Sequence, residues 1–222
     1  MQTRPQILIA DDHVIFADSL RLLLEKRYTV VGTVADGRAL ITEALRLEPD
    51  VIVVDIGMPL LNGLDAAERV RKQLPKVKLV FLTMQDNPNL AAAALELGLA
   101  AFVLKQSAGS ELLMAIDRVM HGKCYMTPKL RSEDWVVQKT RARQYFKHLT
   151  PRQRDIVQLC AEGRPIKEIA GHLNISEKTV EFHKHHIMES FNLLNNAELV
   201  LFALKEGLIS LEPNCLRGKQ SS

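Results

Sequence analysis

The fold is decided by residues 51–59, which read Val51-Ile-Val-Val-Asp-Ile-Gly-Met-Pro59. An unbroken run of β-branched apolar residues predicts a strand that is buried on both faces, because a strand with one face in water alternates apolar and polar side chains. Gly57 and Pro59 follow at once and predict a turn. Asp55 is therefore expected at the carboxyl end of a buried parallel strand, where open α/β sheets bind their ligands.

Short apolar runs alternate with longer amphipathic runs on both sides of this strand, over residues 1–121. The pattern predicts an α/β domain with a five-stranded, parallel, doubly wound sheet. Strands are expected at Ile7–Ala10, Thr29–Val34, Val51–Val54, Val77–Thr83 and Ala101–Leu104, and helices at Val14–Lys26, Gly37–Leu47, Leu64–Leu74, Asn87–Leu97 and Ser110–His121.

The pattern breaks at Gly122, and residues 122–148 are interpreted as a linker in which Trp135–Tyr145 could form a short helix. Residues 149–209 show no strand-like alternation and predict a second, all-α domain, followed by a C-terminal tail at residues 210–222. Its four helices are expected at Pro151–Glu162, Ile166–Leu173, Ser176–Asn192 and Asn196–Glu206.

Composition limits the class of protein. The 222 residues are 47% hydrophobic and 25% charged, which is typical of a chain that buries a core. No apolar stretch approaches the length of about 18 residues that spans a membrane, so a cytoplasmic protein without membrane contact is expected. The basic excess lies in the middle: residues 122–148 hold 7 Lys+Arg against 2 Asp+Glu, whereas residues 149–222 hold 9 against 9.

Polar side chains follow the predicted strands of the first domain. Asp11 and Asp12 follow the first strand and Asp55 the third, while Thr83 and Lys105 follow the fourth and fifth. Carboxyl ends of parallel strands meet at one edge of a sheet, so the three carboxylates should converge there. Their mutual repulsion is relieved by a hard divalent cation with oxygen ligands, and Mg²⁺ is the natural expectation. His13, taken alone, is expected to be a surface histidine.

The second domain contains a helix-turn-helix pattern, with a short helix at residues 166–173, a tight turn, and a longer helix whose first residues are polar. Ser176 is a good N-cap for the second helix. Ile169, Leu173, Ile175, Val180 and Ile187 are expected to form a shared core.

The first domain resembles the receiver domain of bacterial response regulators, which is flavodoxin-like. The resemblance covers Ile7-Leu-Ile-Ala-Asp-Asp-His13, Val53-Val-Asp-Ile-Gly-Met-Pro59 with Asn62-Gly63, Thr83, and Phe102-Val-Leu-Lys105. It implies that Asp55 accepts a phosphoryl group, that Asp11, Asp12, Asp55 and the Gly57 carbonyl hold Mg²⁺, and that Lys105 stabilises the phosphoryl charge. Thr83 and Phe102 would then switch position on phosphorylation.

The second domain resembles the LuxR-type domain of NarL/FixJ regulators, through Leu149-Thr-Pro-Arg152, residues 166–183 and Ala197-Glu-Leu-Val200. Ser176, Lys178, Thr179, His183 and Lys184 are the expected DNA contacts. The resemblance also implies a dimer contact on the last helix, where we expect Leu199, Val200 and Ala203. Glu181 departs from the family, which often has Lys there, and it weakens the positive charge that DNA requires.

Together these patterns predict a phosphorylation-dependent transcription regulator rather than a conventional enzyme. A sensor histidine kinase would phosphorylate Asp55, and the modified chain would form a homodimer on double-stranded DNA. One alternative is a signalling adaptor whose helical domain binds protein, since residues 149–222 carry no net charge. Another assigns a metal to His183, His185 and His186, although only His183 and His186 share a helix face. A phosphohydrolase is disfavoured, since Asp55-Ile-Gly57 lacks a second acid two residues on.

Overall fold

The computed structural model describes residues 4–84, 90–91, 93–94, 97–98, 100–130 and 148–210. The chain divides into two compact units that meet in sequence between His148 and Leu149. The predicted linker helix Trp135–Tyr145 lies outside the described residues, as do residues 211–222 of the predicted tail.

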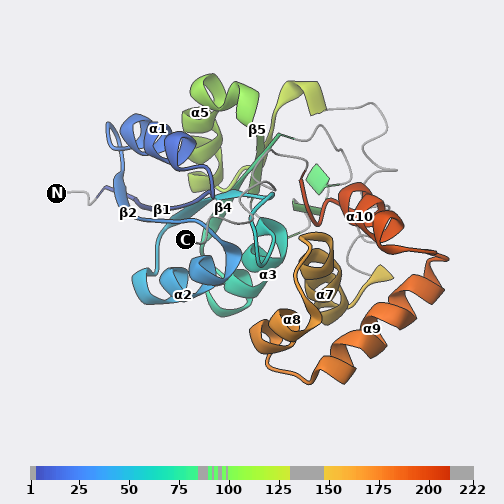
Figure 1. The fold of residues 1–222 in the computed structure, drawn as a ribbon. Coiled ribbons are helices and arrows are strands. Elements are labelled where there is room, and N and C mark those ends of the chain that lie inside the picture. The colour runs from blue at the N-terminus through green and yellow to red at the C-terminus, as the bar shows by residue number, and fades with distance from the viewer. Residues whose placement is uncertain are drawn as a thin grey trace. The chain divides into compact units, whose positions relative to one another are not determined.

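The first unit contains a fully parallel six-stranded sheet in the order β2-β1-β3-β4-β5-β6 (Figure 1). The strands are β1 (Gln6–Ala10), β2 (Thr29–Val34), β3 (Val51–Asp55), β4 (Lys78–Thr83), β5 (Ala100–Leu104) and β6 (Tyr125–Met126). The predicted parallel α/β class is confirmed, since every residue of β3 and β5 is buried.

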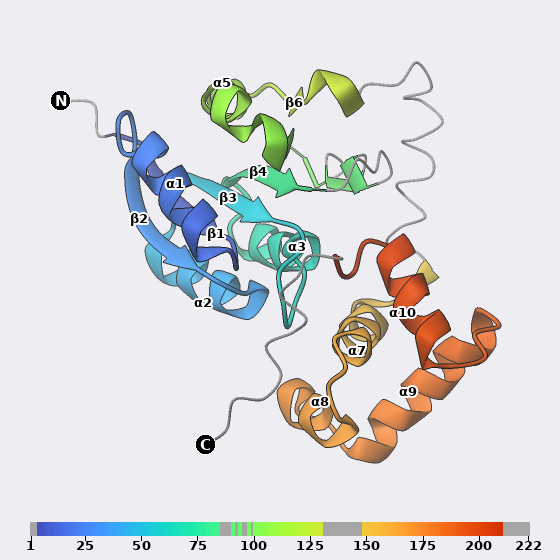
Figure 2. The same cartoon turned by 45° about the horizontal axis from the view of Figure 1, so that its top comes forward.

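Helices cover both faces of this sheet. They are α1 (Val14–Leu24), α2 (Gly37–Leu47), α3 (Gly63–Gln73) and α5 (Ala108–Met120), with short 3-10 helices η1 (Lys105–Ser107) and η2 (Pro128–Leu130). One core forms between the sheet and α2 and α3, and a second core forms between the opposite face and α1 and α5 (Figure 2). Of the predicted helix Asn87–Leu97, only parts are described; residues 90–91 and 93–94 are helical.

The sixth strand was not predicted, and the expectation of five strands is wrong in this respect. Tyr125 and Met126 pair with Ala101 and Phe102 of β5, in residues that we expected to belong to the linker. Two residues are too few for a periodic pattern, so only the pairing with β5 defines this strand. The Thr127 hydroxyl holds it in place by accepting from the Leu104 N–H at 3.2 Å and donating to Glu111 Oε2 at 2.6 Å.

The second unit is all-helical, as predicted, with α7 (Pro151–Ala161), α8 (Ile166–Leu173), α9 (Glu177–Ser190) and α10 (Asn196–Lys205). Helix α7 begins with a capping box between Thr150 and Gln153. Helix α8 ends at Asn174, which adopts the left-handed conformation (φ 53°) that turns the chain into α9. No helix in the described parts of either unit has the length and apolarity needed to cross a membrane.

Candidate functional site

The predicted carboxylates converge at the carboxyl edge of the sheet. In the register between β1 and β3, Ala10 pairs with Val54, so Asp11 lies beside Asp55 where both strands end. One ligating atom each from Asp11, Asp12, His13 and Asp55 lies within 4.8 Å of all the others. Asp11 and Asp55 are buried, at 2% and 3% exposure. The sheet therefore brings together the acidic group that the strand ends predicted.

Lys105 projects into the same cluster from the first residue after β5. Its Nζ donates to Asp55 Oδ2 at 2.9 Å and lies 3.1 Å from Asp11 Oδ2. Its side chain is only 5% exposed. A single ammonium group thus faces two buried carboxylates.

The electrostatics of the cluster are dominated by burial. Burial is the largest influence and raises the pKa of Asp55, the Lys105 ammonium lowers it, and the Asp11 carboxylate raises it, so that the pKa of Asp55 is about 6. Burial by itself lowers the pKa of Lys105, but the facing carboxylates of Asp55 and Asp11 outweigh burial and leave that pKa above its ordinary value. A further positive charge at the site would therefore stabilise the ionised form of Asp55.

The turn after β3 holds Asp55 in place. The Gly57 N–H donates to Asp55 Oδ1 at 3.2 Å, and the Gly63 N–H donates to the Ile56 carbonyl at 2.9 Å. Asn62 caps α3 by accepting from the Asp65 N–H at 2.9 Å. The sequence Asn62-Gly63 is therefore the start of α3, packed directly behind the phosphoacceptor candidate.

The two predicted switch residues lie on neighbouring strands. Thr83 ends β4, one residue beyond Leu82, which pairs with Asp55, and Thr83 is 3% exposed. Phe102 lies within β5, opposite Phe81, and is fully buried in the core beneath α2 and α3. Thr83 is thus at the edge of the sheet where the carboxylates lie, whereas Phe102 pairs with Met126 of β6.

The residues at this edge fit a divalent metal ion. Asp11, Asp12 and Asp55 supply closely spaced carboxylate oxygens, which are the ligands that hard cations prefer. The Asp11 carboxylate contributes to the raised pKa of Asp55, and a cation at the site would relieve this repulsion. Sequence reasoning missed His13, whose Nδ1 lies 3.0 Å from Asp12 Oδ1 and 3.4 Å from Asp11 Oδ1. His13 therefore lies beside the acidic cluster, and its side chain is 30% exposed.

Sequence reasoning also missed Phe16, in the first turn of α1. Its ring centroid lies 5.0 Å from the Lys105 Nζ. An aromatic residue near the start of an amphipathic helix is usually a core residue, and no periodic signal distinguishes one that contacts a charged group. Only the packing of α1 against the sheet shows the contact.

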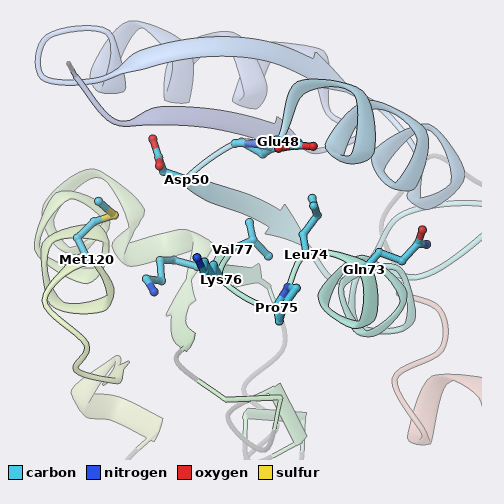
Figure 3. Close-up of a pocket in the computed structure, with 10 residues that line it drawn as sticks. Glu48, Asp50, Gln73, Leu74, Pro75, Lys76, Val77 and Met120 are labelled. Carbon is cyan, nitrogen blue, oxygen red and sulfur yellow. The ribbon is translucent and has the colours of Figure 1, made fainter.

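A pocket of about 430 Å³ lies at the opposite edge of the sheet (Figure 3). It is lined by residues that precede the strands, including Asp50 before β3 and Lys76 and Val77 before β4. Asp55 is at the other end of β3. This pocket is therefore separate from the carboxylate cluster.

The helix-turn-helix of the second unit is formed by α8 and α9. Ser176 caps α9, accepting from the Thr179 N–H at 3.1 Å. Val180 and Ile187 of α9 are buried at 0% and 1% exposure, so they define the inner face of the helix, which turns toward the domain core. Lys178 is exposed, whereas Thr179, His183 and Lys184 are half-buried. Of the expected DNA contacts, Lys178 on α9 and the N-cap residue Ser176 are therefore the exposed ones.

The outer face of α9 carries an aromatic residue that was not predicted as a contact. Phe182 is 65% exposed, and its ring lies 5.7 Å from the His183 ring and 6.3 Å from the His186 ring. His185 is also on the outside, 3.2 Å from Glu189. Helical spacing could have identified this face, because residues 178, 182 and 185 lie opposite the inward Val180 and Ile187.

Helix α10 carries the predicted dimer residues on two different faces. Leu199 and Ala203 are 2% and 0% exposed and belong to the core of the second unit. Val200 is half-buried, and Leu201 is 64% exposed. The side of α10 available to a partner therefore includes Leu201 and Val200, while Leu199 and Ala203 are used within the domain.

Family comparisons match each unit separately. Residues 7–117 match the family described as "Response regulator receiver domain". Residues 147–203 match the family described as "Bacterial regulatory proteins, luxR family".

Curated relatives share both units in one chain. Oxygen regulatory protein NreC of Staphylococcus epidermidis is 34% identical over 215 residues, which cover 92% of this chain and 99% of that protein. Transcriptional regulatory protein MctR of Rhizobium johnstonii is 32% identical, over 95% of this chain and 99% of that protein.

Solved structures of RcsB from Salmonella typhimurium are similar as well. The RcsB response regulator has a TM-score of 0.64 at 27% identity, covering 92% of this chain and 99% of that chain. RcsB bound to promoter P1flhDC in the presence of the phosphomimetic BeF3− has a TM-score of 0.60 at 28% identity, covering 93% and 98%. The chain therefore belongs to the response regulators that join a receiver domain to a LuxR-type helix-turn-helix domain.

Proposed function

We propose that this response regulator acts in the cytoplasm, that Asp55 is its phosphoacceptor and that a cognate sensor histidine kinase is the phosphoryl donor. The observation that carries the proposal is the placement of Asp55 beside the Asp11 carboxylate, with the Lys105 ammonium in contact with both carboxylates. A carboxylate oxygen of Asp55 attacks the phosphorus of a phosphohistidine, the P–N bond breaks, and the electron pair returns to the imidazole. The product is an acyl phosphate on Asp55.

The surrounding residues have distinct tasks in this transfer. Lys105 donates to the phosphoryl oxygens as charge develops on them, because its ammonium already lies 2.9 Å from Asp55 Oδ2. Mg²⁺, when bound by Asp11, Asp12, Asp55 and the Gly57 carbonyl, neutralises phosphoryl charge. Thr83 hydrogen-bonds the phosphoryl group, and the rearrangement of Thr83 and Phe102 reports the modified state to the rest of the unit.

The output is DNA binding by a phosphorylated homodimer. Its support is the match to the LuxR family and the similarity to RcsB, which has been observed bound to a promoter. One α9 offers few positive charges to the phosphates, so two copies on one two-fold site are needed for useful affinity. The exposed part of α10 around Leu201 and Val200 supplies the contact between copies.

The test of the phosphoacceptor uses acetyl phosphate with Mg²⁺ and intact-mass measurement. The wild type gains one phosphoryl group, Asp55→Asn gains none, and the wild type in EDTA gains none. Asp117→Asn is the matched control, because its carboxylate is 67% exposed on α5 and it behaves like the wild type. Equal modification of Asp55→Asn would remove Asp55 from the scheme.

The test of the output is selection of genomic DNA fragments with and without acetyl phosphate. Enrichment of a two-fold sequence that depends on the phosphodonor supports the regulator. If a phosphorylated dimer enriches no sequence, the protein-binding adaptor is favoured. The acidic residues Glu181 and Glu189 on the exposed side of α9 fit that alternative.

A further inference from the structure

Phe16 lies at the phosphoacceptor site and has no part in the chemistry described above. Its half-buried ring comes from the first turn of α1 and packs against the core between α1, α5 and the sheet. The Lys105 Nζ lies 5.0 Å from the centroid of this ring. A cation within about 6 Å of an aromatic centroid, over the ring face, is attracted by the electron-rich face. Phe16 and Lys105 therefore form a cation–π contact.

The Lys105 ammonium consequently has partners of two kinds. Two are charged, Asp55 Oδ2 at 2.9 Å and Asp11 Oδ2 at 3.1 Å, and the third is the neutral ring of Phe16. When Asp55 is phosphorylated, one of its oxygens becomes the bridge to phosphorus and the carboxylate charge is lost. The ammonium must then exchange Asp55 for a phosphoryl oxygen. The ring keeps its attraction throughout, since it neither gains nor loses charge in the transfer.

We propose that Phe16 is a positioning residue whose ring holds the Lys105 ammonium at the phosphoryl site before and during transfer. The inference rests on the proposed role of Asp55. Phe16 acts through Lys105, whose flexible side chain loses its Asp55 partner in the transfer and keeps the Asp11 carboxylate and the Phe16 ring as contacts that order it. The rate of phosphoryl uptake then depends on the electron density of the ring as well as on its volume.

Ring fluorination separates these two properties. The full-length chain is prepared with Phe16 replaced by phenylalanine carrying one, two or three ring fluorines, which weaken the cation–π attraction stepwise at nearly constant shape. Phosphorylation by acetyl phosphate is followed at saturating Mg²⁺; an Asp55 oxygen attacks phosphorus, the P–O bond to the acetyl group breaks, and acetate leaves with the electron pair. The rate constant falls with each fluorine, by about fivefold to tenfold at three.

Further variants complete the series. Phe16→Leu keeps an apolar side chain without a π face and gives a rate as low as the trifluorinated protein, whereas Phe16→Trp restores the rate. Trifluorinated phenylalanine at Phe81 is the matched control, because Phe81 is fully buried in the other core, beneath α2 and α3. That protein keeps the wild-type rate, and thermal melting shows that all these chains are folded.

The results distinguish the inference from the function on which it rests. If the wild type is phosphorylated and the fluorinated series keeps a constant rate, Phe16 is only a core residue and the inference is overturned while Asp55 stands. A loss in Phe16→Leu without a graded loss on fluorination has the same meaning. If the wild type takes up no phosphoryl group, both the inference and the proposed function are refuted.

Discussion

Gly63 packs against the backbone of Asp55, so closely that a Cβ on Gly63 would lie 1.9 Å from the Asp55 carbonyl oxygen. Real side chains do not approach backbone oxygens to this distance. The start of α3 therefore touches the strand end that presents the proposed phosphoacceptor, and glycine is required by space rather than by backbone angle.

Gly63→Ala should destabilise the first unit by about 3 kcal/mol or more, because the clash is with backbone and no side chain can move aside. It should also slow phosphorylation, since relief of the clash displaces Asp55. Gly109→Ala is the matched control, because in the described part of the chain no atom beyond its chain neighbours and its own helix backbone lies within 4 Å of the added Cβ. This variant should gain up to about 1 kcal/mol in unfolding free energy. Urea unfolding followed by circular dichroism measures the unfolding free energies of the two variants. Similar stability of the two variants would contradict the close packing.

Asp55→Asn should stabilise the protein at pH 7.5 in the absence of Mg²⁺. The pKa of Asp55 is raised to about 6, and burial is the largest cause. The folded protein therefore favours the protonated carboxyl. The stability that this preference provides is fully present below the ordinary pKa of the carboxyl and is lost as pH rises through about 6. Asparagine cannot ionise and avoids this loss. The gain should be about 1 to 2 kcal/mol, because the substitution also removes the ion pair with Lys105.

The gain of Asp55→Asn should disappear near pH 4, where the wild-type carboxyl is protonated. Unfolding curves at pH 4, 6 and 7.5 in EDTA test this, with Asp117→Asn as an exposed control that shows no such trend. A wild type that is the more stable protein at pH 7.5 would show that the Lys105 ion pair outweighs burial.

Thr127→Val should cost about 1 to 3 kcal/mol, because it leaves the buried Leu104 N–H without its acceptor and removes the donor to Glu111. The two side chains have nearly the same shape, so the lost hydroxyl is the main change. Thr127→Ser keeps both hydrogen bonds and should remain close to the wild type. Unfolding free energies in urea check the pair. Equal stability of the valine and serine variants would mean that this network does not hold β6 in place.

Phe182→Ala should lower affinity for the selected DNA sequence by about tenfold or more, while affinity for unrelated DNA changes little. The reason is that an exposed apolar side chain on a recognition helix contacts bases rather than phosphates. Lys178→Ala should weaken binding to all sequences and reduce the salt dependence by about one phosphate contact. Fluorescence anisotropy at several salt concentrations separates the two effects. The control is Leu194→Ala, which alters an 84% exposed residue outside α9.

Leu201→Glu should leave phosphorylation of Asp55 unchanged and abolish phosphorylation-dependent dimerisation, because it places a charge on the exposed side of α10. Leu199→Ala should act differently: it creates a cavity in the core of the second unit and costs about 2 to 5 kcal/mol. Sedimentation with acetyl phosphate measures dimerisation. Tight operator binding by monomeric Leu201→Glu would refute the proposed α10 contact.

The sequence by itself determined the class of both units and the residues of the acidic site. Buried parallel strands are unbroken apolar runs, and ligands collect at their carboxyl ends, so Asp11, Asp55, Thr83 and Lys105 could be placed at one edge without coordinates. The turn between α8 and α9 was equally readable, because N-capping by Ser176 is a local property.

Only the tertiary structure decided which partners these residues have. The strand β6 exists through its pairing with β5, and Phe16 reaches Lys105 through the packing of α1 on the sheet. The pKa of Asp55 depends on burial by the whole unit, and the division of α10 into an inner Leu199 and an outer Leu201 depends on the rotation of that helix. Periodicity describes one element at a time, whereas pairing, rotation and burial are set by contacts between elements that are distant in sequence.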